Sequence, residues 1–270
     1  MATSKFARKY GPWALITGAS SGLGAEFARQ LAAAGLNLAL LARRRERLDE
    51  LGAKLADDYD IDTVSIPADL SQRDFMEDVR GRISDLEIGL LVNNAGFGQT
   101  GAFLNGDLDA DLKMLDVNCR APLILTHEIG QAMARRGRGG IVMVASLAGL
   151  MPNPYFAHYS ATKAWDLYLG EGLNVELAGR GIDVVSLCPG PTRTEFFEVA
   201  DVDEAALPAA ARRIIMDADD VVAAALKGLG HRSVVVPGVS NKLMAGSSRL
   251  VPRGLNARLV GRIMKMAAGR

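Results

Sequence analysis

A tyrosine and a lysine four positions apart, Tyr159 and Lys163, are the first candidates for chemistry in this sequence. On a helix this spacing puts both side chains on one face, one turn apart. A free phenol has a pKa of about 10 and is a poor base near neutrality, but a neighbouring ammonium favours the phenolate and lowers that pKa. The phenol could then move a proton to or from a substrate oxygen. The same spacing also arises by chance, with one residue in a core and the other on the surface.

Thirteen positions before the tyrosine, Ser146 follows an apolar run over 141–145. A hydroxyl at the end of a buried strand can donate a hydrogen bond to an oxygen on which negative charge develops during a reaction. We therefore expect Ser146 to act on the same substrate oxygen as Tyr159.

A glycine-rich segment, Thr17-Gly18-Ala19-Ser20-Ser21-Gly22-Leu23-Gly24, lies between an apolar run and a helix-period segment. A glycine turn at the end of a strand gathers backbone N–H groups and the N-terminus of the next helix at one point, where they bind a pyrophosphate. By itself such a segment could be a structural turn. Its place between a predicted strand and a predicted helix favours a dinucleotide site.

Short apolar runs alternate along the chain with longer segments in which apolar residues recur at the period of a helix. The predicted strands cover 13–17, 38–41, 63–67, 88–92, 141–145, 182–187 and 234–236. The predicted helices cover 23–34, 46–59, a segment capped by Ser71, 107–135 with a bend near Pro122, 157–177 and 219–229. Because the strands are continuously apolar, both of their faces must be buried, as in a parallel sheet with helices on both sides. The sequence predicts an α/β doubly wound, Rossmann-type fold of about seven strands, with one domain over 1–237 and an extension over 238–270.

The glycine spacing, Gly-x-x-x-Gly-x-Gly, resembles that of the short-chain dehydrogenase/reductase family in its compact form. Further motifs agree in order, namely Asp69-Leu70, Asn93-Asn94-Ala95-Gly96, Asn118, Ser146 with Tyr159-Ser160-Ala161-Thr162-Lys163, and Pro189-Gly190. The resemblance covers roughly 10–237. It implies an oxidoreductase that interconverts a carbonyl and a secondary alcohol, with hydride moving to or from a nicotinamide.

The resemblance also implies a role for each residue of the catalytic set. Tyr159 is the acid–base group, whose pKa the positive nicotinamide ring lowers further, and Ser146 polarises the substrate oxygen. Lys163 tunes the phenol and binds the nicotinamide ribose. Asn118 holds a water that links Lys163 to solvent; the alternative is a polar residue in a helix bend.

A larger set of residues is expected to bind the cofactor. These are Gly18, Ser20, Ser21, Gly22, Leu23, Gly24, Arg43, Arg44, Asp69, Leu70, Asn93, Ala95, Gly96, Tyr159, Lys163, Pro189, Gly190, Thr192 and Thr194. By resemblance, Asp69 and Leu70 touch the adenine, Asn93 and Ala95 line the adenosine side, and the backbone after Pro189 meets the carboxamide. The segments 93–96 and 189–194 could instead be a polar turn and the start of a proline-rich loop.

The run Arg43-Arg44-Arg45 follows the second predicted strand, where an NAD site usually carries an acid. An arginine there can stack on adenine and pair with a 2′-phosphate, which a carboxylate would repel. We therefore expect NADP(H) in preference to NAD(H), with Arg43 as first choice for this contact and Arg44 as second. The alternative is a solvated, basic helix start, which the helix dipole disfavours. Many relatives also carry a base in the glycine loop, where this chain has Ser21.

Composition argues against several other classes of function. The 31 basic residues balance 31 acidic ones, so no overall field attracts nucleic acid. Cys119 and Cys188 stand apart in apolar segments and are expected to be buried thiols, and three isolated histidines argue against a metal site. With neither a signal peptide nor an 18-residue apolar stretch in the sequence, we expect a soluble, cytoplasmic protein. The resemblance implies a homodimer or homotetramer.

The C-terminal part of the chain is basic. Between 221 and 270 it has nine lysines and arginines and no acid. Over 238–270, apolar and basic residues interleave as in two helices broken near Pro252. These helices could pack on the body or cap the substrate cleft, lie on an anionic membrane surface, or form an oligomer contact.

The sequence favours an NADP(H)-dependent oxidoreductase acting on a small or hydrophobic substrate. One alternative is a non-catalytic, dinucleotide-binding sensor or scaffold, which the complete set of Asn118, Ser146, Tyr159 and Lys163 argues against. Another is a membrane-surface lipid reductase, which requires the extension to bind bilayers. The apolar loop over 196–217 is predicted to cover the cleft, which suggests a hydrophobic substrate.

Overall fold

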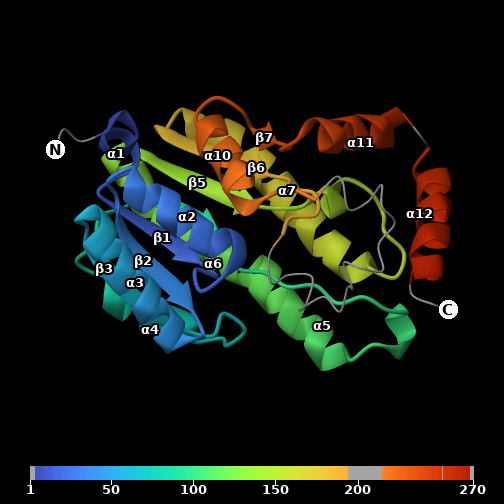
Figure 1. The fold of residues 1–270 in the computed structure, drawn as a ribbon, viewed down its shortest axis with the longest axis horizontal. Coiled ribbons are helices and arrows are strands. Elements are labelled where there is room, and N and C mark those ends of the chain that lie inside the picture. The colour runs from blue at the N-terminus through green and yellow to red at the C-terminus, as the bar shows by residue number, and fades with distance from the viewer. Residues whose placement is uncertain (1–3, 194–214, 251, 268–270) are drawn as a thin grey trace.

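Seven parallel strands form one sheet in the computed structural model of this chain, in the order β3-β2-β1-β4-β5-β6-β7 (Figure 1). The structure describes residues 4–193, 215–250 and 252–267, and for 248–250 and 263–267 the backbone alone. The strands are β1 (Trp13–Thr17), β2 (Asn37–Ala42), β3 (Thr63–Pro67), β4 (Ile88–Asn93), β5 (Gly139–Val144), β6 (Ile182–Leu187) and β7 (Val234–Val235). Each strand boundary lies within two residues of its predicted position.

Helices fill the connections between the strands. The longer ones are α2 (Gly22–Ala33), α3 (Arg45–Tyr59), α4 (Phe75–Ile83), α5 (Leu108–Leu115), α6 (Ala121–Arg136), α7 (Ala157–Ala178), α10 (Ala218–Gly228), α11 (Val239–Leu250) and α12 (Arg253–Ala267). Shorter ones are α1 (Lys5–Tyr10) and the single turns η1 (Phe103–Asn105), η2 (Asp116–Arg120) and η3 (Leu147–Leu150). The sequence analysis did not predict α1, η1 or η3.

The helices bury both faces of the sheet. On one face, α2, α3 and α10 pack side chains such as Phe27, Leu48 and Val221 against the strands. On the other face, α4 and α6 contribute side chains such as Phe75 and Leu125. Successive strand residues point alternately into these two cores, which is why the strands are mainly apolar on both faces. The predicted doubly wound, Rossmann-type fold is therefore confirmed.

The helix after β3 begins later than predicted. It starts at Phe75, after Asp74, and Ser71 does not cap it. Ser71 instead donates its backbone N–H (3.0 Å) and its hydroxyl (2.9 Å) to the Oδ1 atom of Asp69. This side-chain turn is an alternative to helical hydrogen bonding, so it delays the helix.

The helix predicted over 107–135 is interrupted by a π-helical turn, η2, which joins α5 to α6. Pro122 lies in the first turn of α6, where a missing N–H group is tolerated. Because Pro122 cannot donate to the carbonyl four residues earlier, which belongs to Asn118, the regular ladder is broken there. The interruption lies in the residues just before the proline, close to where the sequence analysis expected a bend.

The two central strands, β1 and β4, are the point at which the strand order changes direction. In such sheets, ligands bind in the crevice outside the carboxyl ends of the strands at this point. The backbones of the loops meet closely there. A Cβ atom on Gly24 would lie 2.1 Å from the carbonyl oxygen of Gly18 and 2.6 Å from the Nδ2 atom of Asn94.

The C-terminal extension forms the two predicted helices, α11 and α12, separated near Pro252. Figure 1 shows both beyond one end of the sheet. The side-chain amide of Asn256 donates to the Sδ atom of Met151 at 3.7 Å, and a Cβ atom on Gly261 would lie 3.1 Å from the ring of Pro154. The extension thus lies against the segment that follows β5. Within the described residues, every helix lacks the length or the apolar character needed to cross a membrane.

Gly24→Ala should destabilise the protein and weaken dinucleotide binding. Its methyl group would be forced against backbone atoms that cannot move independently, and overpacking of this kind costs about 1–3 kcal/mol. The measurements are thermal unfolding and titration with NADPH. As a control, Gly172→Ala on α7, where the methyl group meets open space, should stabilise the helix by about 0.5–1 kcal/mol. Equal unfolding temperatures for the two variants would contradict the close approach.

Candidate active site

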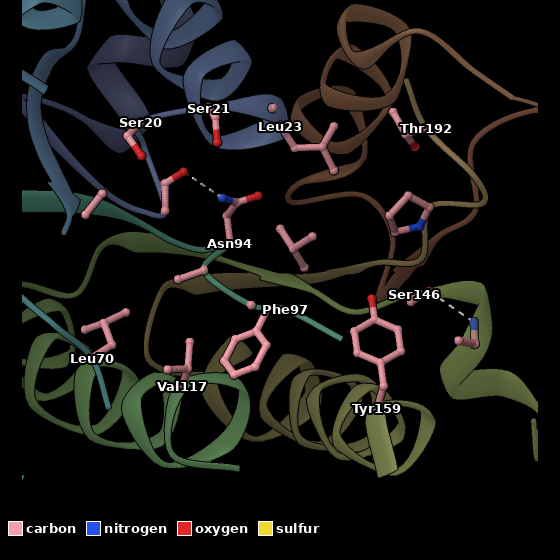
Figure 2. Close-up of a pocket in the computed structure, with 18 of the residues that line it drawn as sticks. Ser20, Ser21, Leu23, Leu70, Asn94, Phe97, Val117, Ser146, Tyr159 and Thr192 are labelled. Carbon is pink, nitrogen blue, oxygen red and sulfur yellow. Dashed lines mark hydrogen bonds between the residues drawn. The ribbon is translucent and has the colours of Figure 1, made fainter. Parts of the chain in front are cut away.

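A cavity of about 800 Å³ opens at the carboxyl ends of the strands. The loops that follow β1 to β6 each contribute to its lining. Figure 2 shows Ser20, Ser21 and Leu23 on one side of this cavity and Tyr159 on the opposite side. The cavity therefore lies between the glycine-rich segment and the catalytic candidates.

The glycine-rich loop takes a conformation that favours glycine and is tied to the loop after β4. Gly18 and Gly22 have positive φ angles of 67° and 54°, which side chains rarely allow. The Oγ1 atom of Thr17 accepts hydrogen bonds from the backbone N–H groups of Asn94 (3.0 Å) and Ala95 (2.9 Å). The loop and the N-terminus of α2 are thereby held at the edge of the cavity, as a phosphate site requires.

The prediction that Asn93 lines the adenosine side is wrong. Its side chain is buried and donates to the Oγ1 atom of Thr126 at 2.9 Å. Strand β4 continues through Asn93, and successive strand side chains point to opposite faces. The next residue, Asn94, lines the cavity instead, and so do Ala95 and Gly96.

The arginines after β2 lie where the sequence analysis expected the cofactor's adenosine end. Arg43 and Arg44 both line the cavity. The guanidinium of Arg44 donates to the hydroxyls of Ser20 (3.0 Å) and Ser21 (2.9 Å), which also line it. A cation and two hydroxyls thus meet at one point, a set that can hold a phosphate group.

The carboxylate of Asp69 lines the same part of the cavity. Burial opposes its charge, but hydrogen bonds from Ser71 and the positive charge of Arg43 outweigh burial. The pKa of Asp69 therefore lies below its usual value, and this side chain is ionised at neutral pH.

Tyr159 and Ser146 face each other at the end of β5. Tyr159 is buried, its ring stacks on that of Phe156 with centroids 4.3 Å apart, and its hydroxyl points toward Ser146 (Figure 2). Ser146 lies two residues after β5 and caps η3, where its Oγ atom accepts the N–H of Ala148 at 3.1 Å. Two hydroxyls therefore converge on one place beside the cavity.

The pKa of Tyr159 departs from the prediction in this structure. Burial raises it, while the charge of Lys163 and the hydrogen bond with Ser146 lower it, and burial outweighs both. The phenol is thus protonated at neutral pH in the chain alone. The expected lowering also counted a positive nicotinamide ring, which would act in the same direction as Lys163.

Lys163 forms a buried ion pair that the sequence analysis missed. Its Nζ atom donates to the Oδ2 atom of Asp166 at 2.9 Å and to the carbonyl of Val144 at 2.8 Å. Burial opposes the ammonium charge, but Asp166 outweighs it and the pKa of Lys163 is raised. An acid three residues after a helical lysine is a signal that could have revealed the pair.

Asn118 is buried behind the cavity wall and joins two elements. Its amide donates to the carbonyl of Phe97 (2.9 Å) and to the hydroxyl of Thr162 (3.0 Å), and its oxygen accepts the N–H of Phe97 (3.1 Å). The loop after β4 is thereby fixed to α7. The water assigned to Asn118 by resemblance stays a prediction.

Most of the predicted site residues meet at the cavity. Those that line it are Gly18, Ser20, Ser21, Gly22, Leu23, Arg43, Arg44, Asp69, Leu70, Ala95, Gly96, Ser146, Tyr159, Pro189, Gly190 and Thr192. Gly24, Asn118 and Lys163 support the lining from behind, while Thr194 and most of the predicted lid over 196–217 lie outside the described residues.

Other polar and sulfur-containing residues have structural surroundings. Cys119 and Cys188 are buried free thiols, as predicted, and burial raises the pKa of each to about 12. His158 shares a hydrogen bond with the carbonyl of Asp111 at 2.9 Å. In the described part of the chain, no cluster of three or more histidine, cysteine or acidic side chains could hold a metal ion.

The fold and the site agree with a known family. The model of the short chain dehydrogenase family matches residues 12–205. The chain belongs to this family. A curated relative, the very-long-chain 3-oxoacyl-CoA reductase of Anas platyrhynchos, is 34% identical to this chain over 195 residues. These residues are 70% of this chain and 62% of the relative. The chain thus spans less than two thirds of that relative's length.

Solved structures extend the similarity to nearly the whole chain. A short-chain dehydrogenase from Sphingobium yanoikuyae in complex with NADPH has a TM-score of 0.80 and 35% identity, covering 92% of this chain and 96% of that one. A structure described for 7beta-hydroxysteroid dehydrogenase stereoselectivity has a TM-score of 0.87 and 27% identity, covering 94% and 98%. These similarities support an oxidoreductase of the short-chain family.

Tyr159→Phe should leave dinucleotide binding intact and lower turnover by about 10²–10⁴-fold, because the acid–base group is lost while the ring remains. NADPH affinity and steady-state reduction of a ketone are the measurements. Tyr168→Phe on the same helix, at an exposed position, is the matched control. Turnover retained in Tyr159→Phe would refute the role of the phenol.

Asp166→Asn should move the alkaline limb of the pH profile for carbonyl reduction to lower pH, by about 1–3 units. Without the carboxylate, burial lowers the pKa of Lys163, and the pKa of Tyr159 falls as well because Asp166 raises it. Carbonyl reduction needs a protonated Tyr159 and a charged Lys163, and in the variant both groups would lose their protons at a lower pH. The readout is kcat/KM against pH for the folded variant.

The control for this experiment is Asp183→Asn. Asp183 pairs with Lys9 at 2.5 Å and accepts the hydroxyl of Tyr10 at 2.6 Å, outside the cavity lining. Its loss should lower the unfolding temperature and leave the pH profile unchanged. If Asp166→Asn behaves in the same way, Asp166 has only a structural role.

Proposed function

We propose that this protein is an NADP(H)-dependent oxidoreductase that interconverts a carbonyl and a secondary alcohol on a hydrophobic substrate. The observation that carries the proposal is the meeting of Ser146, Tyr159 and Lys163 beside the cavity that the glycine loop borders. Ser146 can donate a hydrogen bond to the substrate oxygen, Tyr159 can transfer a proton to it, and Lys163 can stabilise the phenolate that forms. The alternative of a non-catalytic sensor leaves this arrangement without a use.

The residues around the cavity fit a dinucleotide. The glycine loop offers backbone N–H groups at a helix N-terminus for a pyrophosphate. Asp69 and Leu70 line the part of the cavity proposed for adenine. Thr192, whose hydroxyl donates to the carbonyl of Gly190 at 3.0 Å, borders the opposite part. When bound, the dinucleotide supplies or accepts the hydride.

In reduction, the hydroxyls of Ser146 and Tyr159 bind the carbonyl oxygen of the substrate. Tyr159 gives its proton to that oxygen as negative charge develops there. The Lys163 ammonium stabilises the phenolate that remains. Asp166 keeps Lys163 charged in its buried position, so the residue acts through Lys163 as a positioning residue.

The preference for NADP(H) rests on the cluster of Arg43, Arg44, Ser20 and Ser21. Two guanidiniums and two hydroxyls can bind a 2′-phosphate, and Arg43 offers a flat surface for adenine. Asp69 lies after β3, beyond the usual place of the acid in an NAD site at the end of β2. The Sphingobium protein, whose structure was solved with NADPH, adds support.

The character of the substrate follows from the cavity wall near Tyr159. Its side chains include Phe97, Leu147, Met151, Phe156 and Met244. An apolar wall of this kind selects a hydrophobic ketone or alcohol. The compounds named for the two relatives, a very-long-chain 3-oxoacyl-CoA and a 7beta-hydroxysteroid, also have large apolar parts.

We also propose a homodimer or homotetramer in the cytoplasm. Exposed apolar side chains at Leu108, Leu112 and Leu115 follow one another along α5, and Tyr168 and Val175 along α7. Such spacing at helical intervals makes an apolar stripe that a second copy could cover.

NADPH should be used with a kcat/KM about 10–100 times that for NADH, because charge-assisted hydrogen bonds to a phosphate add binding energy. Replacing Arg43 and Arg44 by alanine together should remove this preference, because kcat/KM for NADPH falls much more than that for NADH, which loses only the surface that Arg43 offers to adenine. Arg45→Ala, outside the cavity lining, is the control. The assay follows NADPH consumption over a panel of hydrophobic ketones.

Two outcomes would contradict the proposal. A wild-type preference for NADH overturns the cofactor assignment. Binding of NADPH without consumption over the whole panel would instead favour a non-catalytic dinucleotide-binding protein.

A further inference from the structure

A second cavity, of about 760 Å³, lies between η1, the segment Pro154–Tyr155 and α12, and is here called the distal groove. It is lined by Ala102, Phe103, Leu104, Asn105, Pro154, Tyr155, Ala257, Arg258, Gly261 and Arg262. In Figure 1, α12 lies beyond α7 and α5, at the end of the molecule where the C-terminal extension packs. Neither the catalytic set nor the expected cofactor residues take part in this groove.

The distal groove adjoins the active-site cavity. Residues 94–97 and 100 line the active site, and the chain continues into 102–105, which line the groove. Met151, Asn153 and Phe156 line the active site, and Pro154 and Tyr155 between them line the groove. These two walls are joined by the N–H of Gly101, which donates to the carbonyl of Tyr155 at 2.8 Å.

The residue at this junction has an unusual backbone. Tyr155 has a φ of +64°, a conformation that residues other than glycine rarely adopt and that is concentrated at ligand sites. It places neighbouring residues on different cavities, with Tyr155 in the groove and Phe156 in the active site. The two cavities thus adjoin across this hydrogen-bonded junction, and a substrate that occupies both has to extend over it.

The lining of the groove combines an apolar wall with positive charge. Phe103 and Leu104 are 64% and 92% exposed. On α12, Arg258 and Arg262 are four residues apart and so share one face. The lining includes no carboxylate, and in the described part of the chain neither arginine forms a salt bridge. Such a surface fits an apolar skeleton that ends in an anion.

The acidic residues that are nearest in sequence to the groove residues are not part of the groove lining. The closest to η1 along the chain are Asp107, Asp109 and Asp111, at the start of α5. The Oδ1 atom of Asp107 accepts the N–H of Asp109 at 2.9 Å and so caps that helix. None of the three is a lining residue, and no acid follows Asp220 in the sequence.

We propose that the distal groove binds the anionic end of an extended hydrophobic substrate whose carbonyl reaches Tyr159. The substrate class is a ketone with a carboxylate or phosphate at the far end of its apolar skeleton. The inference rests on the proposed function, since it names a substrate class for the same site. Because the groove adjoins the active site, its charge selects among substrates instead of serving a separate reaction.

The test compares a long-chain oxo-carboxylic acid, with its ketone in mid-chain, and the methyl ester of the same acid. The wild-type enzyme should reduce the acid with a kcat/KM about five to ten times that of the ester. The double variant Arg258→Gln/Arg262→Gln should lose this difference through a higher KM for the acid, with kcat and the ester values unchanged. Arg253→Gln, on the same helix and outside the groove, is the matched control.

Calorimetric titration of the NADPH-bound protein with the oxo acid gives a second readout that needs no turnover. Binding of the oxo acid that is weaker in the double variant, but not in Arg253→Gln, supports the proposal. This holds even if neither ketone is reduced, because absent reduction would count against the proposed activity and not against the anion subsite. Unchanged binding of the acid overturns the proposal. Equal kcat/KM values for acid and ester in the wild-type enzyme also overturn it.

The same variants distinguish a lipid surface from a substrate. Full-length wild-type and double-variant proteins are sedimented with vesicles containing phosphatidylserine at low and high salt. Salt-sensitive binding that the double variant loses, together with unchanged discrimination between acid and ester, would assign the two arginines to a membrane contact and overturn the substrate subsite.

Discussion

The active site depends on keeping one positive charge in a buried place. An ammonium removed from water is unstable unless it is paired, and an unpaired lysine there would lose its proton. In this chain Lys163 is held by the carboxylate of Asp166 and the carbonyl of Val144. The charge that results acts on Tyr159 in the opposite direction to burial. The proton chemistry of the phenol is therefore a balance between burial and a pair of opposite charges.

A second constraint is the close approach of backbones at the centre of the sheet. Gly24 packs on Gly18, and Asn94 reaches across to the carbonyl of Thr17 at 2.9 Å. Gly96 likewise allows a close approach, here between the loop after β4 and α7. A Cβ atom on Gly96 would lie 3.1 Å from the Nζ atom of Lys163. Glycines therefore bring the glycine-rich loop and the proposed acid–base groups to the same edge of the sheet.

The extension after β7 adds a wall to this edge. Met244 of α11 lines the active-site cavity, and Arg258 and Arg262 of α12 line the groove beside it. Of the arrangements the sequence analysis left open, packing against the substrate cleft is the one that these contacts support. The proposed subsite for an anion follows from that packing, because α12 brings basic side chains to an otherwise apolar surface.

The sequence by itself determined the strands, the glycine loop and the pairing of Tyr159 with Lys163, because each depends on spacing along the chain. Strand and helix periods, glycine turns and i to i+4 neighbours are local properties. Tertiary structure decided what each side chain meets. It turned Asn93 into the core and Asn94 toward the cavity, and it made Ser71 a partner of Asp69 instead of a helix cap. It also raised the pKa of Tyr159 through burial and joined η1 to α12 around one groove. Burial and contacts between distant segments arise only when the elements pack, so a pattern along the chain does not contain them.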